Sequence, residues 1–205
     1  MTLPEQLLAP CQQLADYLRA GGIVMLPLIA VSVLMWLLIV ERALFIRRLQ
    51  RRSMSFEDAG EHLRSGRLPR SGASGGITGL LVQRFLTARS GRTEVDRYIL
   101  DETVTTLQRS LSARLPVIGV LAAIAPLLGL LGTVLGMIAT FEVMAIFGTG
   151  NARAMAGGIS EALISTQTGL LVAIPGLYMK GFLDRRAGNL AKHLGAAGLY
   201  LRRQL

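Results

Sequence analysis

Two apolar runs decide the fold: PVIGVLAAIAPLLGLLGTVLGMIA at residues 116–139 and AMAGGISEALISTQTGLLVAIPGLYM at residues 154–179. Each run is longer than the roughly 20 residues that an α-helix needs to cross a bilayer. Inside lipid the backbone polar groups must be hydrogen-bonded internally, and a helix does this within one segment. We therefore expect two adjacent membrane-spanning helices, at 115–146 and 154–180, joined by a loop at 147–153.

A third apolar segment precedes them in the chain. Ile23–Val40 carries no charged residue over its 18 positions, and Glu41 and Arg42 follow it directly. Pro27 falls in the opening turn of this segment, where its missing N–H does least harm to a helix. The segment predicts a first membrane span at 23–40.

The residues before this span, 1–22, predict an amphipathic helix on the membrane surface. Their apolar side chains recur at helical spacing, while the other face is polar. A soluble helix that caps the bundle is the alternative. The apolar face consists of Leu7, Cys11, Leu14 and Leu18.

The formal net charge is +9, and its distribution indicates a topology. The segment 41–114 holds 14 basic residues and the tail from 180 to 205 holds six, whereas the two other connecting segments hold one each. Because short segments rich in Lys and Arg stay in the cytoplasm, we expect a cytoplasmic helical region at 41–114 and a cytoplasmic C-terminal helix at 181–205. The N-terminus and the 147–153 loop are then periplasmic. The basic charge suits anionic lipid rather than nucleic acid.

Two helices are expected to start inside the 41–114 region. Ser55–Asp58 and Thr93–Asp96 each offer a capping hydroxyl followed by acids in the first turn. The helix from Glu94 is expected to run without a break at least to Pro116.

Glu161 is the one acid in the 154–179 run, and a carboxylate inside a membrane is costly enough to indicate function. On a helical wheel, Ser165, Thr166, Gly169 and Ala173 lie on the same side, and most of the Leu and Ile residues lie on the other. We expect the polar side to look into a bundle interior or a wet cavity. A helix-start acid near the outer interface is the alternative for Glu161.

Small residues in both runs predict close helix packing, because lipid supplies no hydrophobic drive to association. Thr133 and Thr166 lie among them, and each hydroxyl could simply bond the carbonyl four residues earlier. The packing positions are Gly129, Gly132, Gly136, Ser165, Gly169 and Ala173.

Three motifs resemble those of the ExbB/TolQ/MotA proton-channel family, with the greatest likeness to its ExbB branch. They read GLLGTVLG at 129–136, GISEALISTQTG at 158–169 and AIP at 173–175. The chain departs from the family pattern at Gln167 and Thr168, where small or apolar residues are expected.

The resemblance implies an all-α membrane protein with three transmembrane helices and long cytoplasmic helical extensions, assembled as a ring. It implies a multi-pass subunit of the bacterial inner membrane, in a homopentamer around an ExbD-like single-span protein. Such a complex uses the proton gradient to energise a TonB-like protein for outer-membrane transport. By motif position, Glu161, Thr133 and Thr166 would line the proton pathway.

The chain alone should conduct protons poorly, because no span offers a second central acid or a His. A partner must supply that group, and the family's partner carries an aspartate in its helix. A TolQ-like role in envelope maintenance and a non-conducting membrane scaffold are the alternatives. No nucleophile–base pair, metal-ligand spacing or cofactor loop is evident and Cys11 is the single cysteine, so we expect no enzyme activity, metal or cofactor.

Overall fold

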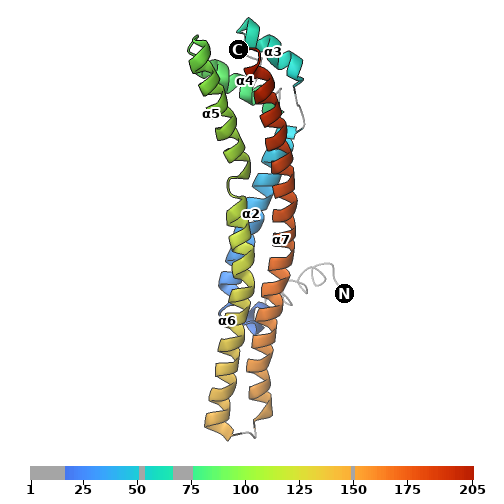
Figure 1. The fold of residues 1–205 in the computed structure, drawn as a ribbon. Coiled ribbons are helices and arrows are strands. Elements are labelled where there is room, and N and C mark those ends of the chain that lie inside the picture. The colour runs from blue at the N-terminus through green and yellow to red at the C-terminus, as the bar shows by residue number, and fades with distance from the viewer. Residues whose placement is uncertain (1–16, 51–53, 67–75, 149–150) are drawn as a thin grey trace, which may run out of the picture. The chain divides into compact units, whose positions relative to one another are not determined.

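The computed structural model describes residues 17–50, 54–66, 76–148 and 151–205 (Figure 1). Within these ranges the regular structure is α-helical and contains no strand, which confirms the all-α prediction. The predicted amphipathic helix at 1–22 lies mostly outside the described residues, and its described part, 17–20, is helical.

The chain divides into two compact units. The first comprises residues up to Leu37 together with Val117–Met179, and the second comprises Leu38–Pro116 together with Lys180–Leu205. Three long helices contribute to both units. They are α2 (Met25–Gln50), α6 (Leu115–Phe147) and α7 (Ala152–Arg202).

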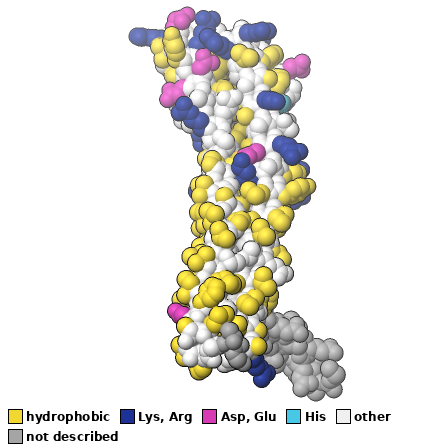
Figure 2. Space-filling model, turned by 60° about the horizontal axis from the view of Figure 1, so that its bottom comes forward, with side chains coloured by type: hydrophobic (Ala, Val, Ile, Leu, Met, Phe, Trp, Pro, Cys, Tyr) yellow, Lys and Arg dark blue, Asp and Glu magenta, His cyan; other side chains and the backbone are white. Residues whose placement is uncertain are grey.

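By length and composition, three helices are long and apolar enough to cross a membrane: α2, the stretch Thr93–Phe147 that contains α6, and α7. No more than 28% of the apolar window of any of them is buried. Figure 2 shows hydrophobic side chains gathered on the surface of these helices. An apolar surface of this extent suits lipid or further protein rather than water, in agreement with the three predicted spans.

The core of the first unit lies where the start of α2 meets α6 and α7. Val24, in the turn just before α2, and Met25 and Leu28 of α2 pack there with Ala125 of α6 and Ala173 of α7. Small side chains on α6 and α7 leave room for the bulky residues of α2 between them. This packing fixes the opening turn of α2 against α7, close to the region that carries Glu161.

The second unit contains three shorter helices, α3 (Phe56–Ser65), α4 (Gly76–Ala88) and α5 (Thr93–Ser112), of which α4 contacts both others. Ser55 caps α3 as predicted, because its Oγ accepts a hydrogen bond from the Glu57 N–H at 3.4 Å. The buried side chains of this unit include Phe85, Leu100 and Leu107.

Helix α5 begins at Thr93, but the prediction that Thr93 caps it is wrong. Arg92 occupies the cap position and provides no side-chain bond. Instead, the buried carboxylate of Asp96 accepts hydrogen bonds from the N–H and hydroxyl of Ser90, at 2.8 and 3.0 Å, and from Arg89 at 3.3 Å. Burial by itself raises the pKa of Asp96, but these bonds outweigh it, so its pKa lies below the ordinary value.

The prediction that the helix from Glu94 runs unbroken to Pro116 is also wrong. Helix α5 ends at Ser112, and α6 starts at Leu115 after a turn in which Arg114 has a φ of 68°. In a continuous helix the Pro116 ring would clash with the carbonyl of the residue four positions earlier. In the first turn of a new helix that conflict disappears. The Arg114 guanidinium forms an ion pair with Glu41 at this turn.

Candidate functional site

The residues of α7 between Glu161 and Gly176 divide into a packed side and an exposed side. Ala162, Ser165 and Ala173 are buried, as are the glycines at 169 and 176. Leu163 and Ile174 are 65% and 66% exposed. Because the small side chains face the other helices, the leucines and isoleucines are left to lipid or to further protein.

Glycines bring α6 and α7 into backbone contact in the first unit. A Cβ added at Gly136 would lie 2.6 Å from the Gly158 carbonyl oxygen, and one at Gly169 would lie 2.7 Å from the Ala125 oxygen. A Cβ at Gly132 would overlap the side chain of Ser165. Such separations are shorter than real Cβ atoms tolerate, so the close approach depends on glycine at these positions.

The Gly129 carbonyl of α6 is a meeting point for hydroxyls of α7. It accepts hydrogen bonds from Thr166 at 3.2 Å and from Ser165 at 3.4 Å. Both hydroxyls also lie within bonding distance of the Ala162 carbonyl of their own helix. Thr133 differs, because its hydroxyl bonds only the Leu130 carbonyl of its own helix, at 2.6 Å, among the described residues.

Glu161 is half-buried on α7 and lies against the turn that precedes α2. A Cβ added at Gly22 would overlap Oε1 of Glu161 and would lie 2.5 Å from its Cδ. Within the described part of the chain, no hydrogen bond or ion pair joins the Glu161 carboxylate to another side chain. The carboxylate of Glu161 therefore lies beside the backbone of Gly22. No Lys or Arg among the described residues forms an ion pair with it.

The two positions that depart from the family pattern have different surroundings. Thr168 donates to the Ile164 carbonyl at 2.7 Å, and its hydroxyl forms a 3.0 Å hydrogen bond with the Tyr17 hydroxyl. Gln167 is exposed. Thr168 thus links the segment before α2 to α7 through Tyr17.

Some of the predicted site residues are joined by hydrogen bonds, and others are not joined within the described residues. Thr166, Ser165 and Gly129 form one hydrogen-bonded group. No bond in the described residues connects Glu161 to Thr133 or Thr166. Glu142, the other acid of this unit's described spans, is exposed near the end of α6.

Two residues that contact α7 were missed by the sequence reasoning, and one of them, Gly22, lies against Glu161. Tyr17 and Gly22 contact α7, yet both lie in a segment predicted only as a surface helix. The pair Gly21–Gly22 directly before an apolar run is a turn signal that points to a reversal of the chain there. Nothing in the sequence specifies that the turn packs on Glu161, because the two positions are far apart along the chain.

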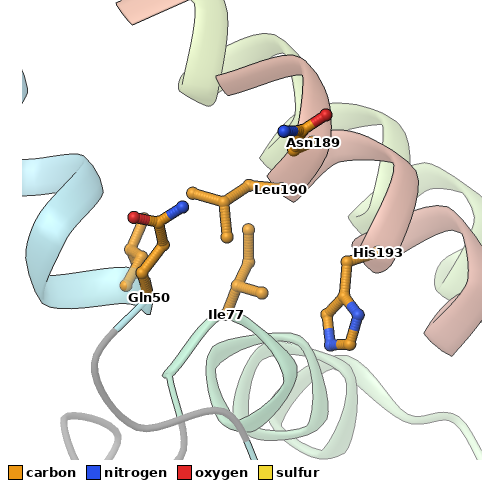
Figure 3. A pocket seen from close by; sticks show the side chains of 6 residues that line it. Gln50, Ile77, Asn189, Leu190 and His193 are labelled. Carbon is orange, nitrogen blue, oxygen red and sulfur yellow. The ribbon is translucent and has the colours of Figure 1, made fainter. Parts of the chain in front are cut away.

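A pocket of about 240 Å³ lies in the second unit (Figure 3). Leu190 and Ile77 point toward one another at its centre, and Gln50, Asn189 and His193 stand around them. Its lining combines the apolar Leu49, Ile77 and Leu190 with the polar Gln50, Asn189 and His193. No group of three or more His, Cys, Asp or Glu that could hold a metal occurs in the residues that the structure describes.

Comparison of the sequence with known proteins identifies one family. The model of the MotA/TolQ/ExbB proton channel family matches residues 75–195, which include all of α6, most of α7 and every residue of the Glu161 motif.

Relatives agree with this match. The putative biopolymer transport protein ExbB-like 3 of Synechocystis sp. is 37% identical over 168 residues, covering 76% of this chain and 77% of the relative. The biopolymer transport protein ExbB of Aquifex aeolicus is 37% identical over 105 residues, covering 51% and 68%. The Tol-Pal system protein TolQ of Haemophilus influenzae is 28% identical over 198 residues, covering 87% of each chain.

Proposed function

This chain belongs to the MotA/TolQ/ExbB proton channel family, and on that premise we propose that it is the ExbB-like subunit of an inner-membrane motor. In this role it uses the proton gradient, together with an ExbD-like single-span partner, to energise a TonB-like protein for outer-membrane transport. The relatives named biopolymer transport protein support the ExbB branch.

The observation that carries the proposal is the setting of Glu161. Its carboxylate lies on an apolar helix, half-buried beside backbone and with no cationic side chain bonded to it among the described residues. A structural acid in a membrane helix is normally paired, because an unpaired charge in lipid is costly. An unpaired acid that can gain and lose a proton is suited to a proton pathway.

A second protonatable group must come from outside the chain. Apart from Glu161, the apolar runs 23–40, 116–139 and 154–179 contain no acid or His. One carboxyl cannot relay a proton across the whole bilayer, so the partner's helix has to carry the other group. This makes conduction a property of the complex.

The exposed apolar surfaces of the three spans support assembly into a ring, which we take to be a homopentamer around the partner's helices. The half-buried side chains of Glu161 and Thr166 would then face the interior of the ring. Native mass spectrometry in mild detergent tests this, and a stable monomer would contradict it.

Proton uptake tests the proposed function directly. Vesicles that contain this chain together with its single-span partner should take up protons along a pH gradient, and vesicles that contain either protein alone should not. Equal uptake with and without the partner would contradict the shared pathway. Absence of uptake from a fully assembled complex would favour a non-conducting scaffold.

A TolQ-like role in envelope maintenance is the second candidate, supported by the TolQ relative that aligns over 87% of this chain. The two roles share the proton chemistry and differ in the protein that receives the work. The single-span protein and the periplasmic protein that co-purify with this chain distinguish them.

A further inference from the structure

We infer that Gly22 is a positioning residue for Glu161, and that the Gly21–Gly22 turn before the first span is part of the proton site. The inference rests on the proposed function of Glu161 and extends it to a segment outside the matched residues 75–195. It starts from the contact between the Gly22 backbone and the Glu161 carboxylate.

The turn has a defined backbone conformation. The Gly21 N–H donates to the Tyr17 carbonyl at 3.2 Å, at the end of the helical stretch whose described part is 17–20. Gly22 then adopts a φ of 71°, which glycine tolerates and other residues rarely adopt. Its carbonyl accepts from the Met25 N–H at 3.2 Å, so α2 starts immediately after the turn.

Three contacts seat this segment on one stripe of α7. Gly22 meets Glu161, a Cβ at Gly21 would lie 3.1 Å from Cγ2 of Ile164, and Tyr17 bonds Thr168. Positions 161, 164 and 168 are separated by three and four residues, which places them on the same face of a helix. The segment therefore follows this face of α7 and covers the Glu161 end of it.

The contact at Glu161 leaves no space for a side chain at position 22. An added Cβ would overlap Oε1 and would lie 2.5 Å from Cδ, so the carboxyl group would have to rotate away. Because proton transfer needs its groups at hydrogen-bond reach, a displaced carboxyl should transfer protons more slowly even in an assembled complex.

The test compares two glycines that share a backbone conformation. Gly148 has a φ of 67° and belongs to the same unit, yet a Cβ there meets no atom of the described residues within 4 Å. Gly22→Ala and Gly148→Ala therefore impose similar left-handed strain, but only the first touches Glu161. We expect Gly22→Ala to lower partner-dependent proton uptake by about tenfold or more, with Gly148→Ala close to wild type.

A double-mutant cycle assigns the effect to the carboxyl. Glu161→Asp shortens the side chain by one methylene, so Gly22→Ala should cost less uptake in the Asp background than in the Glu background. If Glu161→Asp alone abolishes uptake, the thermal midpoint of the assembled complex is read for the same four proteins, and the same coupling is expected there.

Additive effects of the two changes, or a Gly22→Ala complex with wild-type uptake, would overturn the inference. Either result would leave the proposed function intact if Glu161→Gln still abolished uptake. If the wild-type complex took up no protons, the proposed function would fail, and coupled thermal midpoints would then show a packing contact without a role in proton transfer.

Discussion

The hydroxyls of Thr133 and Thr166 bond different carbonyl groups, although both threonines occupy motif positions. Thr166 reaches across to the Gly129 carbonyl of α6, whereas Thr133 bonds the Leu130 carbonyl of its own helix. Thr133→Val and Thr166→Val each remove the hydroxyl at nearly constant volume, so the two variants separate a cross-helix contact from a local one.

We expect Thr166→Val to lower the thermal midpoint of the complex more than Thr133→Val does. The lost bond is worth about 0.5–1.5 kcal/mol, and Ser165 still bonds the same carbonyl. Partner-dependent proton uptake should fall less in Thr166→Val than in Glu161→Gln. The Thr166 hydroxyl can form a hydrogen bond that orients a proton, but it does not ionise. If Thr166→Val and Glu161→Gln lost uptake equally, Thr166 would have a more direct role in proton transfer.

Asp96 makes the second unit sensitive to acid. Its pKa is lowered in the folded state, so its contribution to stability is complete above the ordinary Asp pKa of about 3.9 and is lost as the pH falls through the lowered value. Asp96→Asn should destabilise the protein by about 1–3 kcal/mol near neutral pH, since Ser90 and Arg89 lose a charged acceptor.

Thermal unfolding of wild type and Asp96→Asn between pH 3 and pH 7 checks this prediction. The difference between their midpoints should shrink on the acid side of about 3.9. A constant difference across the range would mean that the ionised form of Asp96 does not stabilise the loop between α4 and α5.

At the scale of elements, the α6–α7 contact depends on glycines with no space for a side chain. Gly136→Leu would drive a side chain into the backbone of α7 at Gly158 and Ala162. Gly157 is the matched control, since it lies on α7 and a Cβ there has no neighbour within 4 Å in the part of the chain that the structure describes. We expect Gly136→Leu to cost about 1–3 kcal/mol or to block assembly.

Assembly is read by size-exclusion chromatography and native mass spectrometry of the two leucine variants. Gly157→Leu should leave the thermal midpoint of the isolated chain at the wild-type value. If Gly136→Leu also assembles with an unchanged thermal midpoint, the close approach of α6 and α7 contributes little to stability.

The helices that span the membrane could be predicted because length and hydropathy alone identify them. The break at Ala113–Arg114 could not, since Pro116 is compatible both with the end of one helix and with the first turn of another. The Gly22–Glu161 contact could not be predicted from the sequence either. Helical periodicity orders residues on one face of one element, but it holds no information on which turn of the chain covers that face.

At the scale of the whole molecule, the distribution of basic residues predicts a periplasmic N-terminus and a cytoplasmic C-terminus. A reporter that is active only outside the cytoplasm, fused after Leu205, should stay silent. A membrane-impermeant thiol reagent should label Cys11 in intact spheroplasts. Activity of the C-terminal fusion would contradict the topology of three spans.

The family match, the apolar spans and the setting of Glu161 together support one central claim, that this carboxyl carries protons in a complex with a partner. Glu161→Gln keeps the shape and the hydrogen-bonding atoms of the side chain but cannot ionise. Glu161→Asp keeps the ionisable group with a shorter reach, and so reports how strictly its position matters.

The most direct measurement is partner-dependent proton uptake by vesicles that contain the Glu161→Gln complex, with assembly and partner binding checked in the same preparation. We expect an assembled, partner-bound complex whose uptake falls to the level of vesicles without the partner. Wild-type uptake in the Gln variant would contradict it and would remove Glu161 from the proton pathway.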